Sequence, residues 1–127
     1  MSAVPNAAPP ISYQLLIEVA RASSVPIGRF GLCHFPAGFY LYTGSARRNL
    51  EARIARHQTP TKKLRWHIDW LLTAPGVRIV EVRCFAMAEC TLNQATGGQV
   101  VVPGFGASDC RAGCGSHLKW LGGKVGG

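Results

Sequence analysis

Apolar and polar residues alternate in several segments of the chain, and this pattern predicts a β-sheet. In the first segment Tyr13, Leu15 and Ile17 fall on one face, because successive side chains of a strand point to opposite sides. Tyr40 and Tyr42 share a face of the second segment in the same way. The predicted strands cover residues 12–19, 38–43, 77–85 and, as a short strand, 99–102.

Between these strands the apolar residues recur at helical spacing. Leu50 and Ile54 form the apolar stripe of one predicted helix, and Leu64, Ile68 and Leu71 form that of the next. The predicted helices cover residues 49–57, 61–72 and 88–94. The turn-rich connection 26–35 contains a short strand and joins the first two strands as a hairpin. This order predicts an α/β (α+β) fold, with a small mixed or antiparallel sheet of three to four strands covered by helices.

Length and composition indicate a single domain. The 127 residues, 47% of them hydrophobic, suffice for one core without a linker. We expect a flexible leader over residues 1–10, the domain over 11–121 and a flexible tail over 122–127.

The charge balance favours a polyanionic partner. Fourteen Lys and Arg against six Asp and Glu leave a net charge of +8, which favours nucleic acid through counterion release and steering. A membrane surface would attract the same charge, but no apolar run approaches about 18 residues, and no signal peptide is recognisable. Five cysteines, an odd number without a secretory signal, indicate reduced thiols. We therefore expect a cytoplasmic protein without a membrane partner.

The segment around Gly44 is where we expect chemistry. A strand carrying Tyr40 and Tyr42 ends at this glycine, and the next helix presents Arg53 and His57 four residues apart on one face. A guanidinium binds phosphate in a planar, bidentate manner, and an imidazole can move a proton near neutral pH. The combination points to phosphodiester chemistry. The alternative is a basic solvated helix face over which a strand tyrosine packs.

As an ordered set, these residues resemble the GIY-YIG nuclease superfamily. The set consists of Tyr13 in the first strand, Tyr42-Thr43-Gly44 at the end of the second, Arg53 and His57 on the next helix, and Glu89 after the third strand. More narrowly, residues 12–120 resemble an uncharacterised GIY-YIG-like branch that occurs alone or fused to endonuclease III. Its motifs here are Leu50-Glu51-Ala52-Arg53, Arg65-Trp66-His67-Ile68-Asp69, Glu89-Cys90, Gly104-Phe105-Gly106, Ser108-Asp109-Cys110 and Ser116-His117-Leu118.

The resemblance implies a role for each catalytic candidate. Tyr13, with Tyr42 as its partner, would be the general base, and Arg53 would hold the scissile phosphate. Arg53 or His57 would help to lower the pKa of the Tyr13 phenol. Glu89 would bind one Mg²⁺ or Mn²⁺ ion, although the helix macrodipole alone also favours glutamate in a first turn.

The implied function is that of a metal-dependent endonuclease acting on DNA, with RNA as an alternative substrate, in repair or processing. The chain departs from the family at Ile11, which stands where the first motif would carry glycine. A nucleic-acid-binding module that keeps the scaffold without turnover is therefore the alternative.

Further basic residues are candidates for phosphate contacts, although scattered solvated cations would look the same. They are Arg47, Arg48, Arg56, Lys62, Lys63 and Arg65. His67 is expected either at the rim of the active site or as a cap on a buried carbonyl. Trp66 and Trp70 either anchor their helix to the core or flank a nucleic-acid groove.

A zinc site is a rival interpretation of the C-terminal region. Cys110, Cys114 and His117 are three zinc-type ligands within eight residues, and Cys90 would complete a tetrahedral set. Their spacing is not that of a standard zinc finger, so we favour a glycine-rich loop with reduced thiols.

Overall fold

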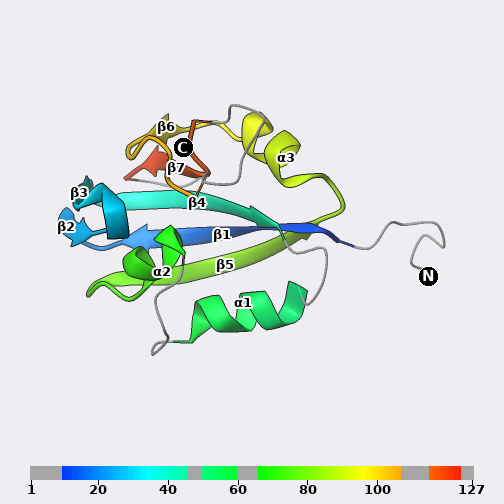
Figure 1. Ribbon diagram of the computed structural model, residues 1–127, viewed down its shortest axis with the longest axis horizontal. Helices are drawn as coiled ribbons and strands as arrows, with labels where there is room; N and C mark the ends of the chain where they lie inside the picture. The colour runs from blue at the N-terminus through cyan, green and yellow to red at the C-terminus, as the bar shows by residue number, and fades with distance from the viewer. Residues whose placement is uncertain (1–9, 46–49, 60–65, 107–114, 124–127) are drawn as a thin grey trace.

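The computed structural model describes residues 10–45, 50–59, 66–106 and 115–123, and its main layer is an antiparallel sheet of five strands in the order β5-β1-β4-β7-β6 (Figure 1). The strands of this sheet are β1 (Ser12–Val19), β4 (Gly38–Ser45), β5 (Val77–Phe85), β6 (Gln99–Val100) and β7 (Leu118–Gly122). A separate hairpin pairs β2 (Ser23–Pro26) with β3 (Leu32–Phe35), and the short 3₁₀-helix η1 (Gly28–Phe30) connects them. The expected α+β class is confirmed.

Strand β1 is the centre of the sheet, because it pairs with β4 on one side and β5 on the other. The predicted alternation of its side chains is confirmed: Tyr13, Leu15 and Ile17 are all buried on one face. The same face of β4 contributes Tyr40 and Tyr42 to the core. One continuous apolar layer therefore runs across the two strands that also carry the candidate site.

Three helices complete the fold. They are α1 (Leu50–Gln58), α2 (His67–Leu72) and α3 (Glu89–Ala95). Leu50 and Ile54 of α1 pack against the core, as their spacing predicts, and so do Trp66 and Trp70 at α2, in the anchoring role. In Figure 1, α1 and α3 flank the end of the sheet where β1 begins and β4 ends.

The sheet is larger than the three to four strands expected. Strand β7 was not among the predicted strands, yet it pairs with β4 through Tyr42 and Leu118. Its sequence contains no β-branched residue, so local propensity does not mark it as a strand and pairing with β4 does. Gly122 belongs to β7, one residue beyond the expected domain end.

Some expectations concern residues outside the described ranges. They include most of the leader and tail, and residues 61–65 of the second predicted helix, which is described from His67 onward. The β2–β3 hairpin was not expected as a sheet of its own, because only a short strand was predicted there. Within the described part of the chain, no helix has the length and apolar character needed to cross a membrane.

The position of Gly44, the last residue but one of β4, requires a glycine. It is the cross-strand partner of Tyr13, and a Cβ added at Gly44 would lie 2.5 Å from both Cζ and Oη of the tyrosine. Such a contact is far inside van der Waals distance, so the phenol ring occupies the space that a side chain would need. The absence of a Cβ at Gly44 is thus what lets Tyr13 lie flat across β4.

Gly44→Ala is expected to lower the free energy of unfolding by about 1–3 kcal/mol, because the new methyl group overpacks the buried ring of Tyr13. Gly97→Ala is the matched control, since a Cβ there meets no atom within 4 Å. Chemical denaturation of the two variants measures the difference. Equal stability of both variants would show that the Tyr13–Gly44 contact does not constrain the fold.

Candidate active site

A hydrogen bond between Tyr13 and His57 lies at the centre of the site. Tyr13 Oη is 2.5 Å from His57 Nε2, and each residue is only 2% exposed. His57 follows Ile54 by three residues on α1, so it continues the stripe through which the helix packs on the core. The helix that was expected to present His57 beside its buried face therefore buries it completely against the strand tyrosines.

Burial controls the ionisation of the two tyrosines. Loss of solvation raises the pKa of Tyr13 well above its usual range; the Arg53 guanidinium opposes this shift, and the Glu89 carboxylate adds to it. Loss of solvation also raises the pKa of Tyr42, and the neighbouring Tyr13 adds to this rise electrostatically. Both phenols are therefore protonated at neutral pH, and Arg53 and Glu89 both lie close enough to act on Tyr13.

Arg53 lies at the exposed side of this cluster. Its guanidinium stands 5.0 Å from the centre of the Trp66 ring, and its Nη1 donates to the carbonyl of Ser45 at 3.2 Å. Ser45 is the last residue of β4, directly after Gly44. Arg53 is thus held at the end of the strand while its side chain remains open to a ligand.

Trp66 owes its position to Asp69. This carboxylate is fully buried, receives both Nη1 and Nη2 of Arg56 at 2.8 and 2.9 Å, and accepts the backbone N–H of Trp66 at 2.9 Å. Arg56 in turn lies 4.4 Å over the Trp66 ring. Arg56 was expected to contact phosphate, but its guanidinium is engaged in this buried ion pair, and it supports the ring that Arg53 contacts.

The position of Glu89 is fixed by a hydrogen bond to His117. Glu89 lies in the first turn of α3, and its Oε2 is 2.8 Å from Nδ1 of the buried His117. The same Nδ1 is 3.3 Å from the carbonyl oxygen of Thr43, whose N–H donates to the His117 carbonyl at 2.9 Å. Because both groups facing Nδ1 are acceptors, Nδ1 carries the proton. The carboxylate is thereby tied to β4 next to Gly44.

The other predicted binding residues have different outcomes. Nδ1 of His67 accepts the N–H of Gly106 at 2.9 Å, and its ring contacts Phe30 and Phe105. Burial lowers the pKa of His67, which keeps the ring neutral for this structural role. The remaining basic candidates, Arg47, Arg48, Lys62, Lys63 and Arg65, lie outside the described residues.

The donor set determines which metal would fit. Among the residues that the structure describes, no group of three His, Cys, Asp or Glu side chains could hold a metal ion. Two of the zinc candidates, Cys110 and Cys114, lie outside those residues, and His117 uses Nδ1 to bind Glu89. A lone carboxylate such as Glu89 suits Mg²⁺ or Mn²⁺, which keep several waters and take further oxygens from a bound phosphate.

The structure therefore brings together all five predicted catalytic residues at one end of the sheet. They are Tyr13, Tyr42, Arg53, His57 and Glu89. The pairing of Asp69 with Arg56 and the contact of Trp66 with Arg53 were missed, although Asp69 and Trp66 belong to a motif that the sequence singled out. Nothing in the spacing shows that Asp69 pairs with Arg56, because that contact depends on how α1 and α2 pack.

Comparison with known proteins identifies one family. The family model described as "Domain of unknown function DUF123" matches residues 12–124, which include every described element. No curated protein and no solved structure matches the chain significantly.

A spectroscopic titration tests the buried cluster. Tyr13, Tyr40 and Tyr42 are the only tyrosines of the chain, and burial raises the pKa of each. Unfolded tyrosine ionises near pH 10, so their contribution to stability is present below about pH 10 and is lost as the pH rises further. We expect no tyrosinate absorbance in the native protein up to about pH 11, and a transition near pH 10 in denaturant. A native transition near pH 10 without unfolding would contradict the burial.

Proposed function

The chain belongs to the DUF123 family, and we propose that it is a metal-dependent endonuclease that hydrolyses phosphodiester bonds in DNA. One observation carries the proposal: a phenol–imidazole pair, an exposed guanidinium and a carboxylate converge where β1 begins and β4 ends. Phosphodiester hydrolysis needs a proton acceptor for the attacking water, positive charge at the phosphoryl oxygens and assistance to the leaving oxygen. Each of the three groups can supply one of these needs.

Arg53 is assigned to the phosphate. Its guanidinium stays charged at any working pH and can donate two parallel hydrogen bonds to phosphoryl oxygens. The Trp66 ring and the Ser45 carbonyl orient it before substrate arrives. Such preorganisation is what makes an electrostatic group effective, because no reorganisation is needed as charge develops in the transition state.

Tyr13 and His57 are assigned to proton transfer. The raised pKa of Tyr13 disfavours a free phenolate, so the phenol acts together with its hydrogen-bond partner. As water attacks phosphorus, its proton passes to Tyr13 Oη, and the phenolic proton passes to Nε2 of His57. The new P–O bond forms while the bond to the leaving oxygen breaks. In this scheme the phenol can accept a proton from water because it passes its own proton to His57. A lowered pKa of the tyrosine is not needed.

Glu89 is assigned to the metal site. His117 contacts Oε2, which leaves Oε1 as the oxygen that would bind the ion. A bound Mg²⁺ or Mn²⁺ would supply charge stabilisation at the leaving oxygen. The contacts of His117 with Thr43 fix the carboxylate near the end of β4, next to Gly44.

The proposal extends to the wider family and the cell. The pairing of Tyr13 with Gly44 gives a physical reason for the two motifs that resemble those of the GIY-YIG superfamily, and we assign the chain to that superfamily on this basis. Cys33 and Cys84 are free thiols, in keeping with a cytoplasmic protein that processes or repairs DNA. The net charge of +8 suits a nucleic-acid partner, DNA or, as the alternative, RNA.

A nucleic-acid-binding module without turnover is the second candidate. It is favoured by the burial of Tyr13, whose hydroxyl already has a partner in His57, and by Ile11 in place of the motif glycine. Both candidates share the same basic surface and the same Arg53, so binding measurements cannot separate them. The two candidates are separated by variants that remove cleavage and leave DNA binding intact.

Arg53→Ala is expected to reduce the single-turnover rate of DNA cleavage about 10²-fold or more, because one preorganised charge is removed from the phosphoryl oxygens. The fold should be unaffected, since the side chain is exposed. Arg78→Ala is the matched control, because Arg78 is an exposed arginine on β5 whose partner is Glu18. An Arg53→Ala protein that is folded and cleaves at the parental rate would exclude the assignment.

Glu89→Gln is expected to abolish cleavage while DNA binding persists or tightens, because only the negative charge that recruits the ion is lost. Mn²⁺ affinity, measured by electron paramagnetic resonance, should fall in the same variant. Glu81→Gln on the exposed face of β5 serves as control. If Glu89 only favours the start of α3, the variant loses about 0.3–1 kcal/mol of stability and cleaves normally, which would reject the metal role.

A further inference from the structure

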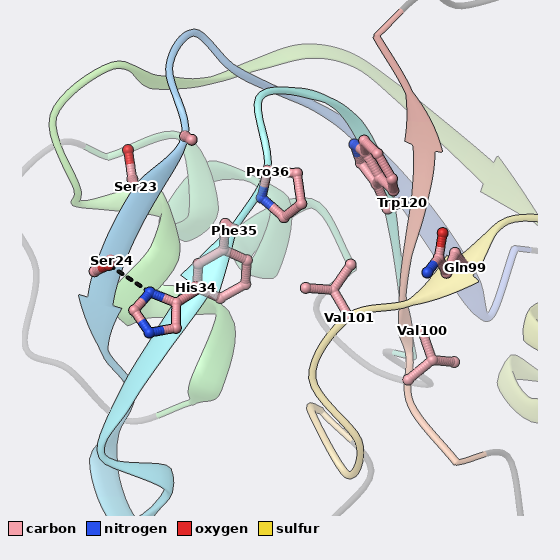
Figure 2. A pocket seen from close by; sticks show the side chains of 10 residues that line it. Ser23, Ser24, His34, Phe35, Pro36, Gln99, Val100, Val101 and Trp120 are labelled. Carbon is pink, nitrogen blue, oxygen red and sulfur yellow. Dashed lines mark hydrogen bonds between the residues drawn. The ribbon is translucent and has the colours of Figure 1, made fainter.

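Figure 2 shows a cavity of about 550 Å³ beside β2 and β3, which Figure 1 shows at the end of the sheet opposite to the start of β1. One wall is formed by the β2–β3 hairpin, with Ser24 and His34, and the other by β6 and β7, with Gln99 and Trp120. Phe35 and Pro36 lie between the two walls. This volume falls within the range of small-molecule sites, and no part of the catalytic scheme uses it.

Trp120 is held rigidly in this cavity. Its Nε1 donates to the carbonyl of Ala37 at 3.3 Å, and its indole packs over Gly38, where a Cβ would lie 2.8 Å from Nε1. The side chain is nevertheless only partly buried. A fixed indole with an accessible surface is a platform on which a flat ring can stack without loss of side-chain entropy.

The polar side chains of the cavity are hydroxyl, imidazole and carboxamide groups that form hydrogen bonds. Ser24 and His34 are cross-strand partners joined by a hydrogen bond of 2.6 Å, and the exposed Gln99 contributes a carboxamide on the other wall. None of the described residues that line the cavity is Asp, Glu, Lys or Arg. The chemistry therefore suits an uncharged planar group with donors and acceptors along its edge.

We propose that this cavity binds one unpaired nucleobase of the DNA strand that is cleaved at the Tyr13–His57 pair, an inference that rests on the proposed function. A nucleobase is the part of a nucleic acid that is flat, uncharged and edged with donors and acceptors. The +8 charge of the chain favours a polyanion as the ligand that carries this ring, and the exposed Arg21 precedes the cavity wall by one residue.

The register of the sheet sets the spacing between the two sites. Trp120 pairs with Tyr40, and Tyr13 pairs with Gly44 on the same strand, β4. Trp120 and Tyr13 also share one face of the sheet, because Tyr40 and Tyr42 do. Four residues of β4 span about 13 Å. The bound base should therefore lie a few nucleotides from the cleaved bond on the same strand, which suits a flap or other partly unpaired substrate.

An abasic scan of a labelled flap DNA tests the proposal. A single abasic site is moved one nucleotide at a time along the unpaired strand, and affinity for the parent protein is measured by fluorescence anisotropy without divalent metal. We expect one abasic position, a few nucleotides from the cleaved bond, to weaken binding about 10-fold, the loss expected for one stacked base. Other positions should have little effect.

The same abasic scan, repeated with variants of residues that line the cavity, tests whether the cavity is the place where the base binds. Trp120→Leu should bind the intact flap about 10-fold more weakly and should lose its sensitivity to the abasic site, since both changes remove the same stacking contact. Trp70→Leu is the matched control, and Gln99→Ala, at an exposed position, tests the cavity without disturbing the core. Fully paired DNA should bind all these proteins equally well.

Two outcomes would overturn the inference. If the parent protein binds and cleaves the flap but no abasic position matters, or if Trp120→Leu and Gln99→Ala both bind like the parent, the cavity does not hold a base while the proposed function stands. If the parent protein binds no DNA or RNA at all, the inference and the proposed function fail together.

Discussion

The packing of Tyr13 against Gly44 is the constraint on which the rest of the site depends. Antiparallel pairing of β1 with β4 puts the two residues opposite each other, and the missing Cβ leaves room for the phenol. That position places Oη within 2.5 Å of His57 on α1. Since Ser45 and Thr43 flank Gly44, the same short segment also receives Arg53 through the Ser45 carbonyl and His117 through the Thr43 carbonyl.

Burial holds this arrangement in place, but it also makes the phenol of Tyr13 harder to ionise. Removal of water from Tyr13 raises the pKa of its phenol, so the tyrosine alone would be a poor base at neutral pH. In the proposed mechanism the imidazole of His57 offsets this disadvantage, because its Nε2 accepts the proton of the same hydroxyl. A comparable balance governs the neighbouring ion pair, where Asp69 is fully buried and is compensated by the two hydrogen bonds from Arg56. The pair supports Trp66, and Trp66 supports Arg53.

The periodicity of apolar residues along the chain was enough to predict most of the strands and helices. The strand over residues 12–19 and the strand over 77–85 agree with β1 and β5, because both alternate clearly. Strand β7 was not predicted, since its strand conformation depends on pairing with β4 and not on its own residues. In the site, Arg53 and His57 followed from helical spacing, whereas the Asp69–Arg56 pair and the Glu89–His117 pair join residues that are distant in sequence. Such contacts depend on helix packing, which no periodicity encodes.

The central claim, that the cluster around Tyr13 hydrolyses phosphodiester bonds with the help of a divalent metal, is tested most directly by the unmodified protein. Purified protein is incubated with labelled duplex, flap, junction and single-stranded DNAs in Mg²⁺, in Mn²⁺ and in chelator. The account predicts cleavage of at least one branched or partly unpaired substrate in Mg²⁺ or Mn²⁺, and none in chelator. Retention of all substrates intact with either metal, together with tight binding, would contradict it and would establish the protein as a binding module.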